Sequence, residues 1–120
     1  MARKHLSKEE RLKIYHMHDG CCAYCGKKLE LKDMQVDHIV PVYKDGANDI
    51  ENYLPACRAC NFYKGAMSVE KFRENLKGIP KRLEKLFIFR LAEQYGLVKV
   101  NDKRIYFVFE QDDAINGNRR

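Results

Sequence analysis

Two pairs of cysteines constrain the fold of this chain more than any other feature. Cys22 and Cys25 form one C-x-x-C pair, and Cys57 and Cys60 form the second. The two residues between the cysteines of a pair let both sulfur atoms face one ion. The basic N-terminus lacks the apolar stretch of a secretory signal, so we expect metal binding rather than disulfide bonds. Four thiolates suit tetrahedral zinc, and because they would fill all its positions, the ion is expected to be structural.

The composition is that of a small soluble domain with a basic bias. A chain of 120 residues, 45% hydrophobic and 33% charged, is expected to fold as one domain whose small core gains from a bound metal. The 23 basic and 17 acidic side chains give a net charge of +6, which favours a polyanionic partner such as nucleic acid. A basic bias by itself is equally compatible with a protein that binds no polyanion. No apolar run is long enough to cross a membrane, so no membrane partner is expected.

The residues between the cysteine pairs favour extended structure. Residues 34–43 are rich in β-branched side chains and predict a strand, which Pro41 restricts to a short or edge strand. Residues 44–46 read Lys-Asp-Gly, a turn signal, and residues 52–54 lead into the second cysteine pair. The sequence therefore predicts two short extended segments between the cysteines.

Helices are expected on both sides of this segment. Ser7 and Glu10 have the spacing of a capping box and predict a helix over residues 7–17. Further helices are expected from 61 to about 66, from 68 to 76, and from Pro80 to a stop at Gly96. Residues 97–100 and 105–109 look strand-like, and the polar residues between them fit a β-hairpin.

Asp37 and His38 are adjacent between the cysteine pairs and are candidates for catalysis. A carboxylate suits Mg²⁺, and an imidazole near neutral pKa suits proton removal from water. Neighbouring side chains on a strand point to opposite faces, so both reach one site only if the strand ends or bends there. Taken alone, an Asp-His pair is more often a surface charge next to a hydrogen-bonded histidine.

The order of motifs resembles a known family. C-A-Y-C-G at 22–26, V-D-H-I-V-P at 36–41, Asn52, and C-R-A-C-N-F-Y-K-G at 57–65 resemble the HNH endonucleases with a ββα-metal motif. The resemblance is strongest to the small zinc-containing kind that phages and mobile elements encode. It implies double-stranded DNA as the substrate, the cytoplasm of a bacterial or phage-infected cell as the location, and a phage protein or a second copy as a possible partner.

The resemblance also implies roles for individual residues. His38 would be the general base, and Asp37 and Asn61 would hold a catalytic divalent metal. Asn52 would fix the hairpin loop and orient the catalytic His38. Since Asn61 stands where other members have histidine, its neutral oxygen favours Mg²⁺ or Mn²⁺ over a tight transition-metal site. Two basic residues near the second pair are candidates for phosphate contacts, with plain surface charge as the alternative: Arg58 and Lys64.

The sequence thus predicts a small single α+β domain over residues 1–120. Its core would be a zinc-stapled ββα-metal motif at 22–65, followed by a helical and hairpin extension at 68–110. A metal-dependent DNA endonuclease fits best, because a binding module needs no carboxylate beside a phosphate. A non-catalytic zinc-knuckle module that binds nucleic acid is the main alternative. A zinc-stapled protein adaptor that uses the third helix and the hairpin as its surface is a third possibility.

Overall fold

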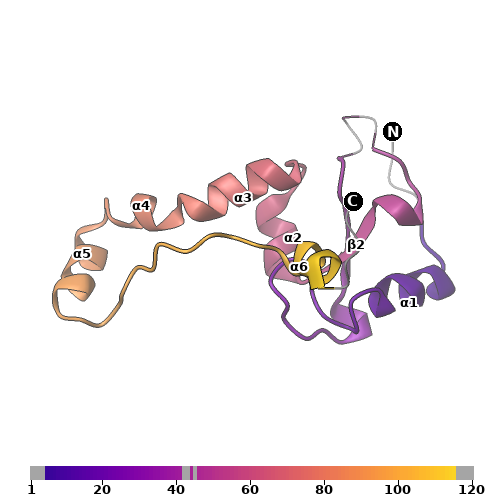
Figure 1. The fold of residues 1–120 in the computed structure, drawn as a ribbon, viewed down its shortest axis with the longest axis horizontal. Helices are drawn as coiled ribbons and strands as arrows, with labels where there is room; N and C mark the ends of the chain where they lie inside the picture. Colours follow the sequence, from indigo (N-terminus) through magenta and orange to yellow (C-terminus); the bar gives the residue numbers. More distant parts are fainter. Residues whose placement is uncertain (1–4, 42–43, 45, 116–120) are drawn as a thin grey trace. The chain divides into compact units, whose positions relative to one another are not determined.

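The computed structural model describes residues 5–41, 44 and 46–115 (Figure 1). They form a small α+β structure with a two-stranded antiparallel sheet and several helices. The chain divides into two compact units, which we call unit 1 (1–69 with 106–120) and unit 2 (70–105). The predicted organisation as one domain, with a core at 22–65 and an extension at 68–110, stays a prediction.

A short hairpin lies at the centre of unit 1. Strand β1 spans Gln35–His38 and pairs with β2, Tyr53–Ala56, so that Asp37 lies opposite Leu54 and His38 opposite Tyr53. The first strand is shorter than the predicted extended segment: it ends at His38, and residues 42 and 43 lie outside the described residues. Beyond His38, the backbone N and O of Val40 bond to the side chain of Asn52 instead of to a strand, and Pro41 has no N–H to donate to a ladder.

The first helix, α1 (Lys8–His16), anchors the segment that leads into β1. Its predicted capping box is confirmed, because Glu10 N donates to Ser7 Oγ at 3.1 Å and Ser7 N donates to Glu10 Oε1 at 3.0 Å. From the middle of the helix, Arg11 Nη2 donates to the carbonyl oxygens of Leu31 and Met34, both at 3.1 Å. These bonds hold the 3₁₀ turn η1 (Leu31–Asp33) against the helix.

Helix α2 (Arg58–Lys64) follows β2 and completes a ββα arrangement. It begins earlier than the predicted start at residue 61. The reason is that Cys57 serves as the N-cap, with its Sγ accepting a hydrogen bond from Cys60 N at 3.4 Å. Gly65, with φ of 53°, ends the helix in a backbone conformation that favours glycine. The cysteine pair therefore shapes the helix start as well as supplying thiols.

The predicted C-terminal hairpin is wrong. Within the described residues no strand forms at 97–100 or 105–109, and Val108–Ile115 is a helix, α6. Glu110 Oε1 accepts from Phe107 N at 2.9 Å, a local bond that favours a helix start over a strand. Figure 1 shows α6 at the C-terminal end of the chain, and Phe109 N donates to Ala23 O at 2.8 Å. The segment therefore packs on the first cysteine pair instead of pairing with 97–100.

Unit 2 consists of α3 (Val69–Lys77, which begins one residue before it), α4 (Ile79–Leu83) and α5 (Phe87–Gln94). The prediction of one helix from 80 to 96 is wrong, because Leu86 is extended and separates α4 from α5. Arg90 Nη1 donates to Glu84 O at 2.6 Å and so satisfies a carbonyl at the break. Several large apolar side chains of this unit are exposed: Leu86, Phe87, Ile88, Tyr95, Leu97 and Val98.

Among the described residues, no helix is both long and apolar enough to cross a bilayer.

Candidate functional site

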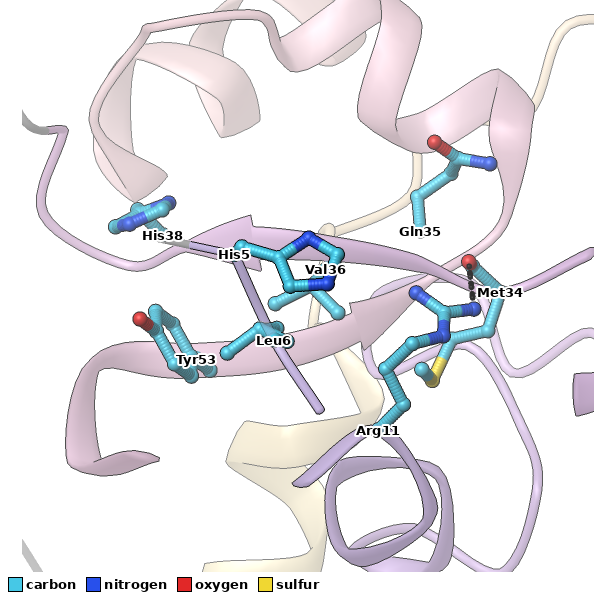
Figure 2. Close-up of a pocket in the computed structure, with 8 residues that line it drawn as sticks. All are labelled: His5, Leu6, Arg11, Met34, Gln35, Val36, His38 and Tyr53. Atoms are coloured by element: carbon cyan, nitrogen blue, oxygen red, sulfur yellow. Dashed lines mark hydrogen bonds between the residues drawn. The ribbon is translucent and has the colours of Figure 1, made fainter. Parts of the chain in front are cut away.

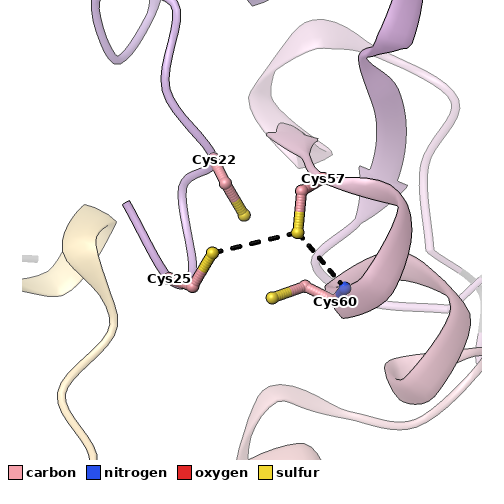
Figure 3. Close-up of side chains that lie close together, drawn as sticks. All are labelled: Cys22, Cys25, Cys57 and Cys60. Carbon is pink, nitrogen blue, oxygen red and sulfur yellow. Dashed lines mark hydrogen bonds between the residues drawn. The ribbon is translucent and has the colours of Figure 1, made fainter. Parts of the chain in front are cut away.

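The four predicted cysteine ligands come together in unit 1. The ligand atoms of Cys22, Cys25, Cys57 and Cys60 all lie within 4.8 Å of one another, and Figure 3 shows the four thiols turned toward a common point. The Sγ atoms of Cys25 and Cys57 are 3.8 Å apart. Tetrahedral zinc with Zn–S bonds of ~2.3 Å has S–S edges of about 3.8 Å, so the cluster fits that ion.

The four thiols lie close enough to shift one another's pKa values. A hydrogen bond from the Cys60 thiol lowers the pKa of Cys22 to about 4. The same hydrogen bond, with burial next, raises the pKa of Cys60, and burial raises that of Cys25. The protein alone therefore favours one thiolate and disfavours further negative charge nearby. A divalent cation would supply the charge that lets all four sulfurs ionise.

A backbone hydrogen bond attaches the first cysteine pair to the hairpin, and the second pair follows the hairpin directly in the sequence. Ala23 N, between the two cysteines, donates to Pro55 O on β2 at 2.8 Å. Cys57 follows β2 directly at the N-cap of α2. The cluster therefore fixes the start of α2 relative to the strands, and this sets where the side chains of α2 meet β1.

The candidate metal ligand Asp37 is buried between α2 and the first cysteine pair. Its side chain is 4% exposed, and Oδ2 accepts from Tyr24 Oη at 2.5 Å and lies 3.0 Å from Lys64 Nζ. Lys64 Nζ also donates to Asp37 Oδ1 at 3.3 Å and to His38 O at 3.0 Å. Both carboxylate oxygens of Asp37 therefore have a partner from this chain.

Lys64 is neither a surface charge nor an exposed phosphate contact in this structure. Its side chain is 1% exposed and points from the last residue of α2 to β1. Buried lysines are rare unless an anion pairs with them, and Asp37 is that anion. The other predicted phosphate contact, Arg58, is exposed at the first residue of the same helix.

His38 ends β1 and is buried, with its ring held on two sides. Nε2 lies 2.9 Å from Asn48 Oδ1, and the ring meets that of Tyr53 edge-on at 5.1 Å. Since an amide oxygen only accepts, Nε2 donates the proton and Nδ1 carries the lone pair of the neutral ring. The Asp37 carboxylate contacts Tyr24 and Lys64, whereas the His38 ring contacts Asn48 and Tyr53, so the contacts of the two side chains differ.

Asn52 closes the loop between the strands. Its Oδ1 accepts from Val40 N at 2.9 Å, and its Nδ2 donates to Val40 O at 3.0 Å and to Ala47 O at 2.9 Å. Ala47 precedes Asn48 in the sequence. Through these backbone bonds Asn52 positions Asn48, whose side chain contacts the His38 ring. Gly46 fits the same loop because a Cβ there would overlap the carbonyl of Val40.

Asn61, the second predicted metal ligand, lies half-buried in the middle of α2. Its backbone N–H donates to Cys57 O and its carbonyl accepts from Gly65 N, both at 3.0 Å. Residues three apart on a helix share a face, so Asn61 lies one turn before Lys64 on the side that meets β1. A carboxylate and an amide oxygen are donors that Mg²⁺ accepts, so Asp37 and Asn61 fit that ion chemically.

A hollow of about 290 Å³ opens beside His38 on the hairpin (Figure 2). Its lining combines hairpin residues with residues of the α1 segment: His5, Leu6, Arg11, Met34, Gln35, Val36, His38 and Tyr53. Three of these carry polar nitrogen atoms besides His38, namely His5, Arg11 and Gln35. His38 is therefore one of the residues that line a hollow in the surface of the hairpin.

Three residues around the site were not identified from the sequence. Tyr24 packs edge-on against Phe107 at 5.1 Å while its hydroxyl reaches Asp37. Burial, and then the charge of Asp37, raise the pKa of Tyr24, so the hydroxyl keeps its proton and donates. Asn48 holds His38. The Y of C-x-Y-C was a usable signal for Tyr24, but no local pattern marks Asn48 or Phe107.

Comparisons with known proteins point to the same segment. Residues 22–66 match the family model of the HNH endonucleases. Over 45 residues the chain is 42% identical to the CRISPR-associated endonuclease Cas9 of Corynebacterium diphtheriae, covering 37% of this chain and 4% of that protein.

A solved structure is similar in fold. The crystal structure of the Type II-C Cas9 enzyme from Actinomyces naeslundii matches with a TM-score of 0.50 and 24% sequence identity. The match covers 61% of this chain and 9% of that chain, and it concerns the fold alone. This chain therefore spans a small fraction of the length of both proteins.

Proposed function

We propose that this chain is a divalent-metal-dependent endonuclease that hydrolyses phosphodiester bonds of DNA, because residues 22–66 match the family model of the HNH endonucleases. The observation that carries the proposal is the buried placement of Asp37 and His38 at the end of β1, with Lys64 of α2 bonded to the Asp37 carboxylate and to the His38 backbone oxygen. A buried carboxylate and a buried imidazole on neighbouring residues, on a frame fixed by a four-cysteine cluster, suit hydrolysis better than passive binding.

Two metals have separate places in this proposal. Cys22, Cys25, Cys57 and Cys60 would hold zinc with a complete thiolate shell, which leaves no position for water and makes the ion structural. Asp37 and Asn61 would hold Mg²⁺ or Mn²⁺. That ion would supply Lewis-acid polarisation of the scissile phosphate.

His38 is proposed as the general base. Asn48 accepts the proton of Nε2, which leaves Nδ1 as the ring atom that takes a proton from water. Asn52 acts through the loop, since its side chain bonds the backbone of Val40 and of Ala47, the residue before Asn48. The contact with the Tyr53 ring keeps the imidazole plane fixed and limits the rotamers open to it.

The distribution of charge supports DNA as the substrate. Unit 2 holds ten lysines and arginines against five acidic residues, so most of the net charge of +6 lies within it. Arg58 adds an exposed guanidinium at the start of α2. Basic side chains release counterions from the DNA backbone on binding, which makes the affinity depend on salt.

The proposal is tested with supercoiled plasmid, the zinc-loaded full chain, and Mg²⁺, Mn²⁺ or no added divalent metal. We expect nicked or linear product with metal only, and none with the His38→Ala variant that keeps zinc and fold. Loss of a general base lowers rates by about 10²- to 10⁴-fold. Wild-type protein that binds the plasmid but leaves it intact under every metal condition would identify the non-catalytic zinc-knuckle module instead.

A further inference from the structure

A buried cation stands at the carboxylate that is proposed to hold the catalytic metal. Lys64 Nζ lies 3.0 Å from Asp37 Oδ2 and 3.3 Å from Oδ1, with side-chain exposures of 1% and 4%. His38 O accepts a third bond from the same ammonium at 3.0 Å. The ammonium therefore bridges Asp37 and the backbone of the proposed base.

The positive charge of Lys64 lowers the attraction of Asp37 for a divalent cation. The Asp37–Lys64 pair is neutral overall, whereas Asp37 alone would offer a divalent ion one full negative charge. An ion entering beside Lys64 meets a positive charge a few ångströms away, where little water screens the repulsion. Tyr24 contacts the same carboxylate through a neutral hydroxyl and adds no such repulsion.

We propose that Lys64 is the internal counter-ion of Asp37 and couples binding of the catalytic metal to the arrival of a DNA phosphate. This inference rests on the proposed function. A phosphate brings negative charge that balances the ammonium and the divalent ion together. The free protein should therefore bind the catalytic metal weakly, and DNA and metal should strengthen each other's binding by the same factor, as linkage requires.

Lys64 and the proposed metal ligand Asn61 lie on the same helix, α2. Asn61 lies one turn before Lys64 on α2, so the residue proposed to complete the metal site and the residue proposed to oppose the metal share one helix face. A lysine side chain is a flexible four-carbon stem, so the proposal requires only this side chain to leave Asp37 when the metal and the phosphate bind. The coupling is thus confined to one side chain.

The test measures Mn²⁺ binding by electron paramagnetic resonance on zinc-loaded full chain, with and without a DNA duplex. All proteins carry His38→Ala, so the duplex stays uncut. Asp37→Asn defines the signal that belongs to other Mn²⁺ sites. We expect Lys64→Met to tighten Mn²⁺ binding without DNA at least tenfold and to reduce the gain that DNA produces. Tyr24→Phe, which removes an uncharged partner of the same carboxylate, is the matched control and should change both quantities less than threefold.

Several results would overturn this role. One is a folded, zinc-loaded Lys64→Met protein that binds Mn²⁺ no more tightly than its parent without DNA. Another is an equal effect of Tyr24→Phe, since charge would then not be the cause. If Lys64→Met does not fold, the parent His38→Ala protein provides the test. Equal Mn²⁺ affinity of the parent with and without DNA would show that metal and DNA binding are not coupled. None of these readouts uses cleavage, so failure here is distinct from failure of the nuclease assay.

Discussion

Nε2 of His38 lies 2.9 Å from Oδ1 of Asn48, a residue of the loop that Asn52 closes. The bond fixes both the ring orientation and the tautomer of the imidazole. It connects the proposed base to a loop whose geometry is set by side-chain bonds to the backbone rather than by strand pairing.

Asn48→Ala is expected to lower kcat about 10- to 100-fold with little change in KM, because a misplaced base slows chemistry more than binding. Plasmid nicking at saturating DNA measures kcat. Asn48→Asp keeps an acceptor for Nε2 and is expected to retain more activity than the alanine variant. Equal losses in the two variants would mean that the hydrogen bond to His38 is not what matters.

Asn52→Ala is expected to lower the free energy of unfolding by about 2–4 kcal/mol, since backbone groups of Val40 and Ala47 lose their partner. Thermal and urea unfolding of the zinc-loaded protein measure the change. Asn101→Ala, at an exposed position in unit 2, is the control and is expected to alter stability by less than about 0.5 kcal/mol. A stable Asn52→Ala protein would show that the loop closes without this side chain.

Cys57→Ser is expected to release most of the zinc and to lower the melting temperature sharply, because Cys57 is both a candidate ligand and the N-cap of α2. Metal content by mass spectrometry and thermal melting measure the two effects. Cys21→Ser, outside the four-cysteine cluster, should retain zinc and fold. Full zinc content in Cys57→Ser would remove this thiol from the ligand set.

Chelation should separate the two metals. Mild EDTA treatment is expected to stop plasmid cleavage while zinc and fold remain, because oxygen donors hold Mg²⁺ more weakly than four thiolates hold zinc. Added Mg²⁺ or Mn²⁺ should restore cutting. Cleavage that continues at full rate in chelator, with added metal making no difference, would contradict a second, catalytic ion.

Neutralising basic residues of unit 2 should weaken DNA binding and lower its salt dependence. Replacing Lys81, Arg82 and Lys85 by glutamine is expected to reduce the slope of log affinity against log salt by about one for each DNA phosphate that is no longer neutralised. The matched control replaces Lys27, Lys28 and Lys32, which are exposed in unit 1, by glutamine. If only the control variant bound DNA more weakly, the DNA-binding surface would lie in unit 1.

Some features were predictable because their cause is local. The capping box of Ser7 and Glu10 needs only residues three apart, and it forms as predicted. The convergence of the cysteine pairs is also confirmed, since the C-x-x-C spacing aims each pair of sulfurs at one point. The roles of Asp37, Asn61 and His38 in catalysis stay predictions.

The C-terminal segment was not predictable, because its sequence suits two structures. Phe107 and Phe109 alternate as in a strand, yet both rings pack edge-on against Tyr24, at 5.1 Å and 5.7 Å. An apolar alternation says that side chains share a face without saying what covers that face. Here the covering residue lies more than eighty positions earlier in the chain.

The sequence by itself determined which donor groups this protein offers: soft thiols in two close pairs, and an Asp-His-Asn set of harder donors between and beside them. Only the tertiary structure decided which charges form ion pairs. Lys64 reaches Asp37 from another element, 27 positions along the chain, and no local sequence pattern predicts a contact at that separation. Hydrogen-bonding and capping preferences act between neighbours in sequence. Burial of an ion pair depends instead on how β1 and α2 pack, and that packing is a property of the whole fold.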